Sequence, residues 1–372
     1  MGRLRTTVAR RAFLHVGAPK SGTTFLQSVL WANKDRLRES RVLLPGADQF
    51  DAFYATMNVR GISREAGLPD RATDAWPRLV ADAAEWPGDV VISHEFFAAA
   101  TAEQAAAARR DLAPAEVHVV MTVRDYVAQV PALWQESVKV GSQTSFERFV
   151  AQMLGNQRKG PLGWAAADVV AVLDRWGTGL APHTIHVVTV PRPDAPSELL
   201  WHRMCEVLAL DPSGWEIPQT RRNQSLGAVQ VEMLRRLNPW LQPPLGRAGA
   251  PHYRWIRRYL AEDILVSQGG RRVGLPRDAA AALRHRGEAA VRSIEERGWD
   301  VVGDLKDLVA EPLDSGKADP GDVDTDEMLD EAMRTIAELV ERQRRADRAM
   351  RRQHGAEPGG PTLLHRLTSR RR

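Results

Sequence analysis

The chain has 372 residues, of which 43% are hydrophobic and 26% charged, and its formal net charge is +4. These values are typical of a globular protein and exclude a chain that is disordered or collagen-like throughout. No apolar run reaches the roughly 18 residues of a membrane helix, and we expect no signal peptide. The single cysteine, Cys205, allows no internal disulfide, so we expect a cytoplasmic protein in which this residue lies in the core.

Four short runs are rich in Val, Ile or Leu, and their hydrophobicity is continuous rather than alternating. They span residues 12–16, 90–93, 117–123 and 184–190. Such runs are typical of a parallel sheet that is covered on both faces. Helical segments separate them, at residues 24–39, 101–111, 126–139, 146–154 and 165–176. The alternation predicts an α/β fold, a sandwich with a central parallel sheet flanked by helices.

The second half of the chain is predicted to be mostly helical. Its helical patterns span residues 198–208, 225–237, 255–265 and 279–298. Between two of them, residues 239–251 are rich in Pro and Gly, which predicts a long loop. Residues 1–313 are therefore expected to form one domain, and the polar residues 314–324 a linker behind it.

A charged amphipathic helix is predicted over residues 325–353. Its apolar residues follow a spacing close to a coiled-coil seam, through which the chain could form a homo-oligomer: Leu329, Met333, Ile336 and Val340. Residues 354–372 are expected to be a basic, disordered tail. Residues 341–372 hold ten arginines and three acids, or +7, which leaves −3 for the rest. The high pI thus comes from a terminal arm, and no specific nucleic-acid binding is predicted.

The most informative segment is FLHVGAPKSGTTFLQ, residues 13–27. A strand runs into a loop rich in Gly and Ser and then directly into a helix. Backbone N–H groups and the positive end of the helix dipole therefore converge on one spot, which predicts a cradle for phosphate or sulfate. Lys20 adds a cation inside the loop, and Thr23 and Thr24 add hydroxyl groups at the start of the helix.

The loop differs from the nucleotide P-loop, G-x-x-x-x-G-K-[ST], at one decisive position. Gly17 and Gly22 have the correct separation, but Thr23 follows where the lysine should stand. This argues against ordinary ATP or GTP hydrolysis. A P-loop kinase acting on a small molecule, which would need Mg²⁺, remains one alternative. The other is a non-catalytic interaction protein with a decayed nucleotide loop, which would act through its helical tail.

The string APKSGTT, residues 18–24, resembles the 5′-phosphosulfate-binding loop of the sulfotransferases that use 3′-phosphoadenosine 5′-phosphosulfate (PAPS). The resemblance implies a P-loop-like fold and a soluble enzyme that needs no metal. It also implies that Lys20 contacts the transferring sulfuryl group and the leaving phosphate. The residues that would hold the phosphosulfate are Pro19, Lys20, Ser21, Gly22, Thr23 and Thr24.

The second family element is a strand that ends in an arginine, followed by a helix with a serine eight residues later. Both contact the 3′-phosphate of PAPS. Residues 117–124, VHVVMTVR, supply the strand and Arg124, but Ala132 stands at the serine position. A guanidinium suits a terminal phosphate dianion. Without the first motif, Arg124 would more simply form a surface ion pair with Asp125 or another carboxylate.

Three further stretches resemble bacterial members of the family more weakly. They are residues 134–141, WQESVKVG; residues 221–226, RRNQSL; and residues 299–308, WDVVGDLKDL. The second implies that Arg221 and Arg222 help to hold PAPS, because a late basic segment often closes over the donor in this family. The resemblance covers roughly residues 11–310 and does not extend to the C-terminal helix.

The family places its catalytic base after the second strand, as His in some branches and Glu in others. That place here reads VVISHEFF, residues 90–97, with His94 and Glu95 side by side. A neutral His has a suitable pKa without tuning, whereas a Glu needs its pKa raised or acts by orienting the hydroxyl. The pattern favours Glu95, with His94 as the second choice.

The sequence therefore predicts a sulfotransferase that moves a sulfuryl group from PAPS to a hydroxyl or amine. The acceptor could be a small molecule, a carbohydrate, a lipid, a polyketide or a peptide. The histidines show neither H-x-x-x-H nor H-E-x-x-H spacing, so no metal site is predicted.

Overall fold

A six-stranded sheet forms the centre of the computed structural model, which describes residues 10–64, 68–218, 225–245, 250–309 and 317–353. Every neighbouring pair of strands is parallel, and the order is β2-β3-β1-β4-β5-β6. The strands are β1 (Arg11–Gly17), β2 (Val42–Leu43), β3 (Asp89–Ser93), β4 (Glu116–Val123), β5 (Ile185–Thr189) and β6 (Asp300–Val302). The predicted α/β fold with a central parallel sheet is confirmed.

Helices cover both faces of the sheet, as the continuous apolar strands require. Alternate residues of β1 show this directly, because Phe13 packs with one layer of helices and Leu14 with the other. The first layer holds α1 (Thr23–Ala32), α2 (Lys34–Glu39) and α10 (Leu199–Leu208). The second includes α3 (Gln49–Val59), α4 (Ala75–Glu85), α5 (Ala102–Asp111), α6 (Tyr126–Lys139), α7 (Phe146–Leu154), α8 (Trp164–Ala167), α9 (Val169–Gly177) and α14 (Arg277–Arg297). Cys205 is buried in the first layer, as expected.

The structure corrects two of the predicted boundaries. The helix expected over residues 24–39 is divided into α1 and α2 at Asn33, whose side chain donates to the carbonyl of Glu216 at 2.7 Å. The long loop expected over residues 239–251 is wrong in its first half, because α11 (Ala228–Leu245) continues through it. Asn238 anchors this helix by donating to the carbonyls of Val138 and Ser142, both at 2.9 Å.

The second half of the chain is mostly helical, as predicted. It continues through α12 (Ala250–His252), the π-helix η4 (Tyr253–Leu265) and α13 (Val266–Gln268). Within the predicted linker, residues 317–324 pack on the body: Ala318 bridges to Val273, and η6 (Pro320–Asp322) begins at a buried proline. The division of the chain into domains stays a prediction.

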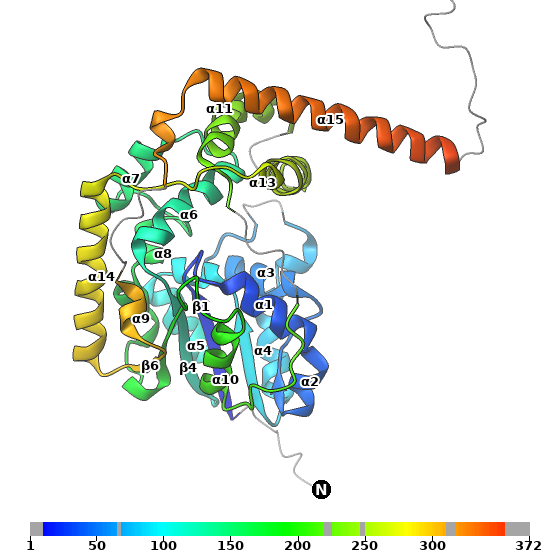
Figure 1. The fold of residues 1–372 in the computed structure, drawn as a ribbon. Coiled ribbons are helices and arrows are strands. Elements are labelled where there is room, and N and C mark those ends of the chain that lie inside the picture. The colour runs from blue at the N-terminus through cyan, green and yellow to red at the C-terminus, as the bar shows by residue number, and fades with distance from the viewer. Residues whose placement is uncertain (1–9, 65–67, 219–224, 246–249, 310–316, 354–372) are drawn as a thin grey trace, which may run out of the picture.

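The C-terminal helix α15 (Thr325–Gln353) is a single helix, as predicted, and extends away from the α/β body (Figure 1). Its first part packs against α11 and η4. In the part of the chain that the structure describes, no helix combines the length and the apolar character needed to cross a membrane.

Candidate active site

The loop of residues 17–24, here called the cradle loop, leaves the carboxyl end of β1 and runs directly into α1. Gly17 has a φ of +109°, and a Cβ at this position would lie 2.9 Å from both the Cα and the carbonyl oxygen of Glu95. Only glycine permits so close an approach with this backbone. The cradle loop therefore begins against the backbone of the residue that the sequence favoured as the base.

Neighbouring elements hold the cradle loop in place. The backbone N–H of Ala18 donates to the carbonyl of Thr122 at 2.9 Å, and the Gln129 side chain donates to the carbonyl of Pro19 at 2.8 Å. The Ser21 hydroxyl is fully buried and lies 2.7 Å from the Thr122 hydroxyl, with a further bond to the carbonyl of Ala18. Ser21 thus stabilises the conformation of the loop through buried hydrogen bonds.

The start of α1 is open to an anion. Lys20 and Gly22 both have left-handed backbone conformations, with φ of +65° and +81°. Gly22 is the N-cap and offers no side-chain cap, and the first turn holds no acidic residue. The first N–H groups of a helix have no partner within it, so they can bind an anion here. Thr24 is exposed at this end, whereas Thr23 is buried.

The ammonium group of Lys20 lies 3.3 Å from a carboxylate oxygen of Glu136 in α6. Lys139 lies 3.0 Å from the same oxygen, and Arg257 of η4 contacts the other carboxylate oxygen. Three cations thus surround Glu136, and one of them, Arg257, also lies 3.4 Å from a carboxylate oxygen of Glu262. Sequence analysis did not find Glu136, Lys139 or Arg257.

The ionisation of Glu136 follows from this arrangement. Burial alone would raise its pKa, but Lys139, Lys20 and Arg257 outweigh burial and hold the pKa of Glu136 well below its ordinary value. Glu136 is therefore ionised at neutral pH and orders the three cations around it. Burial lowers the pKa of Lys139, although Glu136 opposes that effect.

Arg124 directly follows β4, and its guanidinium lies 3.5 Å from the carbonyl of Lys20. Among the residues that the structure describes, no carboxylate lies within 4.0 Å of it. Asp125 does not form the ion pair that the sequence left open, because its carboxylate accepts from the backbone N–H of Ala128 at 2.7 Å. Burial lowers the pKa of Arg124, yet a guanidinium stays charged at neutral pH. The cradle loop is thus bordered by an arginine that has no carboxylate in direct contact among the described residues.

Other predicted donor-binding positions contribute less. Ala132 of α6 offers no hydroxyl, and the hydroxyl of Ser137 is buried and donates to the carbonyl of Trp134 at 2.7 Å. Arg221 and Arg222 lie outside the described residues. Their predicted role stays a prediction.

Glu95 begins the 3₁₀-helix η2 (Glu95–Ala99), directly after β3. Its carboxylate accepts from the Gln27 side chain at 3.0 Å, and Gln27 belongs to α1. Burial would raise its pKa, but His94, the residue's own backbone N–H and Gln27 outweigh burial, so the pKa of Glu95 lies below its ordinary value. The carboxylate is therefore ionised at neutral pH.

His94 is the N-cap of η2. Its Nδ1 accepts from the backbone N–H of Phe96 at 3.1 Å, and its ring packs against Phe53 and Phe96. Burial lowers the pKa of His94, so the ring is neutral. Because Nδ1 is an acceptor, the proton of the neutral ring resides on Nε2. In this state Nε2 can donate a hydrogen bond but cannot accept a proton.

Below the cradle loop, His15 connects three strands. Its Nδ1 lies 2.8 Å from the Ser93 hydroxyl and its Nε2 lies 3.1 Å from the Thr122 hydroxyl. Burial lowers the pKa of His15 to about 4, partly opposed by Glu95. The neutral ring joins β1 to β3 and β4 at the end of the sheet that supports the loop.

This burial predicts a loss of stability in mild acid. An unfolded His binds a proton near pH 6.5, so the unfolded state gains protons before the native state as the pH falls. Stability should therefore decline from pH 6.5 towards pH 4, on the order of 3 kcal/mol for this group alone. Urea unfolding at pH 7 and pH 5 measures the effect. His15→Gln should show a smaller difference between the two pH values, and an equal difference would contradict this role.

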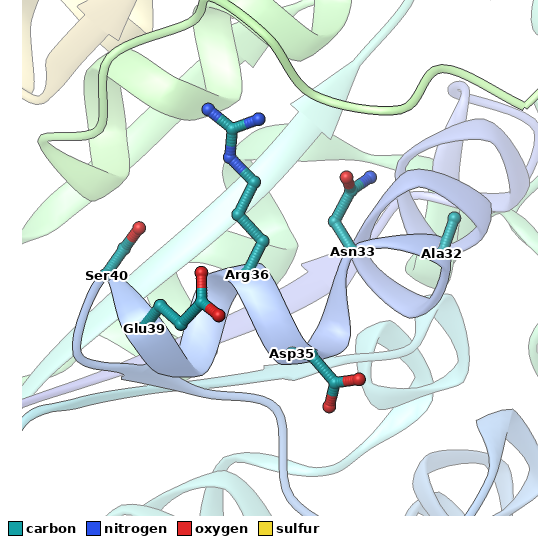
Figure 2. Close-up of a pocket in the computed structure, with 6 residues that line it drawn as sticks. All are labelled: Ala32, Asn33, Asp35, Arg36, Glu39 and Ser40. Carbon is teal, nitrogen blue, oxygen red and sulfur yellow. The ribbon is translucent and has the colours of Figure 1, made fainter.

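An open pocket of about 640 Å³ lies elsewhere, along α1 and α2. Figure 2 shows its lining: Ala32, Asn33, Asp35, Arg36, Glu39 and Ser40. Arg36 donates to the carbonyls of Ser213 and Gly214 and stacks on Trp215. These contacts fasten α2 to the segment after α10, and none of the lining residues belongs to the site around the cradle loop. Within the described ranges, no group of three or more His, Cys, Asp or Glu could hold a metal ion.

Comparisons with known proteins add little to this geometry. No protein-family model matches the chain, and no curated protein matches it. Among solved structures, the chain is similar to a crystal structure of a sulfotransferase from Alicyclobacillus acidocaldarius, with 17% sequence identity and a TM-score of 0.40. The match covers 68% of this chain and 98% of that one.

Proposed function

We propose that the chain is a sulfotransferase that moves a sulfuryl group from PAPS to a hydroxyl or amine of an acceptor. The observation that carries the proposal is the pairing of Lys20 with Arg124. One cation lies inside the strand-to-helix loop, and a second, with no carboxylate within 4.0 Å among the described residues, borders that loop. A nucleotide with phosphate groups at both ends of its ribose would engage both cations.

The residues present fit such a donor. The uncapped start of α1, with Gly22 and the backbone N–H groups of Thr23 and Thr24, would hold the 5′-phosphate. Arg124 would hold the 3′-phosphate through its planar fork of donors. Lys20 would leave Glu136 and bind the oxygen that bridges sulfur and phosphorus. Since Lys139 and Arg257 still contact Glu136, the acid would keep its counterions.

The transfer step forms one bond to sulfur and breaks another, and no metal takes part in it. The acceptor oxygen forms a bond to sulfur while the bond between sulfur and the 5′-phosphate oxygen breaks, giving a sulfate ester and 3′-phosphoadenosine 5′-phosphate (PAP). Negative charge grows on the leaving phosphate, where Lys20 and the N–H groups of the loop would stabilise it. The acceptor proton passes to a nearby base.

Glu95 suits that role better than His94. Because its pKa is lowered rather than raised, Glu95 would act by orienting the acceptor hydroxyl and would take its proton late, as the bond to sulfur forms. Its carboxylate is ionised and lies beside the cradle loop, because Gly17 packs on its backbone. Gln27 fixes its orientation from the helix that follows the loop. The Nδ1 atom of His94 is already bonded to the backbone, so we assign His94 to the positioning of η2.

The direct test uses ³⁵S-labelled PAPS and an extract of small molecules, lipids and glycans. The protein is expected to transfer label to a product of the extract, and that product identifies the acceptor. Lys20→Ala, incubated in parallel, should give little product. A labelled product from PAPS that is equal for both proteins, or label recovered only as free sulfate, would contradict the proposal.

Arg124→Ala tests the 3′-phosphate contact separately. Charge-assisted hydrogen bonds contribute about 1.5–3 kcal/mol, so affinity for PAP should fall about 10- to 100-fold. Affinity for adenosine 5′-phosphate, which lacks the 3′-phosphate, should change little. Calorimetric titration with both nucleotides measures the difference. An equal loss of affinity for the two nucleotides would show that Arg124 does not bind the 3′-phosphate.

A further inference from the structure

Two of the three cations around Glu136 can be reached by a ligand. The side chains of Lys20 and Arg257 are 31% and 30% exposed. Those of Glu136 and Lys139 are 10% and 15% exposed, so they form the buried part of the cluster. Lys20 and Arg257 lie against opposite oxygens of the Glu136 carboxylate. Because one carboxylate bridges them, the two cations are spaced to flank a single small oxyanion.

Arg257 comes from a part of the chain far from the cradle loop. It belongs to η4, a π-helix of 13 residues that packs against α6. Figure 1 shows α6 and the end of this helix, labelled α13, above the sheet. π-helices are rare and occur often at functional sites. Neutralising Glu136 does not require Arg257, because Lys139 stays in contact with that acid after Lys20 has left it.

Arg257 also interacts with the residue that we assign as the base. Burial would lower the pKa of Arg257, but Glu136, Glu262, Tyr253 and Glu95 outweigh burial and raise it. The charge of Glu95 is one of these contributions, so its carboxylate lies within electrostatic range of the guanidinium. Arg257 therefore interacts with Glu136 on the donor side of the site and with Glu95 on the acceptor side.

The guanidinium of Arg257 keeps donors for a ligand. Its Nη1 contacts Glu136, and its Nε lies 3.4 Å from a carboxylate oxygen of Glu262. Glu262 is shared with Arg258, also at 3.4 Å, so it has a second counterion. A guanidinium offers five N–H donors in a planar fork, and these two contacts do not use all of them.

We propose that Arg257 is a further catalytic residue, which binds the oxygens of the transferring sulfuryl group. The inference rests on the proposed function. The acceptor oxygen forms a bond to sulfur while the bond between sulfur and the 5′-phosphate oxygen breaks, and the acceptor proton passes to the Glu95 carboxylate. Three oxygens stay on sulfur throughout and share its negative charge. Lys20 stabilises the leaving oxygen, and Arg257 stabilises these three.

Arg257→Ala separates this role from nucleotide binding, because PAP lacks the sulfuryl group. In calorimetric titration the variant should bind PAP as the parent does. Its initial rate of ³⁵S transfer from PAPS to the extract should fall about 10²- to 10³-fold. Glu136 keeps Lys20 and Lys139 as partners, so the melting temperature should stay close to the parent's. Arg257→Lys, which keeps the charge but not the planar fork, should have an intermediate rate.

Arg258→Ala is the matched control, because Arg258 is the next residue, has a 61% exposed side chain and contacts Glu262 rather than Glu136. It should keep the parent's rate. The assignment is overturned if Arg257→Ala also keeps that rate, if both alanine variants lose it equally, or if Arg257→Ala loses as much PAP affinity as rate. Where Arg257→Ala does not fold, Arg257→Lys decides, and the parent's rate in that variant overturns the assignment.

The parent protein distinguishes failure of this inference from failure of the proposed function. A parent that binds PAP and transfers label while Arg257→Ala matches its rate leaves the proposed function intact and removes only the role of Arg257. A parent that neither binds PAP nor transfers label contradicts the proposed function, and the role of Arg257 falls with it.

Discussion

Lys20→Ala is expected to lower kcat/KM for sulfuryl transfer about 10²- to 10³-fold. The ammonium group would stabilise charge on the leaving phosphate, and the uncapped helix start and Arg124 cannot replace it at that position. The fold should survive, because the backbone of the cradle loop is held by Thr122 and Gln129 rather than by this side chain. Steady-state kinetics with labelled PAPS measures the loss.

The control for Lys20→Ala is Lys159→Ala, which removes the same charge at an exposed position that precedes α8. It should keep the parent's rate and its melting temperature. If both variants lose activity equally, the effect is one of net charge, and the role of Lys20 is contradicted. Retention of the parent's rate by Lys20→Ala would contradict it as well.

Glu95→Gln is expected to lower kcat about 10²- to 10⁴-fold, because an amide cannot take the acceptor proton. It should leave PAP affinity unchanged, since Glu95 does not contact the donor in our account. The pH dependence gives a second readout. The active form is the carboxylate and its pKa lies below the ordinary value, so the parent should stay active through neutral pH and lose activity only as the pH falls through that pKa. The variant should lack this acid limb.

His94→Asn is the matched variant for the second candidate. Asparagine is a favourable N-cap and can accept from Phe96 as the imidazole does, so η2 should keep its position. We expect less than a tenfold change in kcat. The reverse pattern, a large loss for His94→Asn and a small one for Glu95→Gln, would assign the base to His94.

Sequence patterns predicted the centre of the sheet well and its edges poorly. The strands β1, β3, β4 and β5 each have at least five residues and are mostly apolar, so their hydrophobic pattern can be recognised in the sequence. The edge strands β2 and β6 have two and three residues, too few to show a period. The second half of α11 was predicted as a loop because it contains three prolines. Hydrogen bonds from the side chains of Asn238 and Gln242 to carbonyls at the end of α6 outweigh this low helix propensity.

The candidate site was predictable where one segment carries the chemistry. The cradle loop and the residues after β3 and β4 are local motifs, and the structure places Lys20, Glu95 and Arg124 around the end of β1. The environment of Glu136 was not predictable. An acid and a lysine three residues apart on a helix, such as Glu136 and Lys139, are typical of an exposed ion pair. Arg257 comes from a π-helix more than a hundred residues later in the chain.

The central claim is that the cradle loop binds a nucleotide phosphorylated at both ends of its ribose, without metal. Calorimetric titration of the full chain with PAP in the presence of EDTA tests it most directly. We predict saturable binding of one PAP per chain, at least tenfold weaker binding of ATP, and loss of PAP binding in the combined variant Lys20→Ala and Arg124→Ala. Absence of PAP binding, or binding of ATP alone and only with Mg²⁺, would contradict the account.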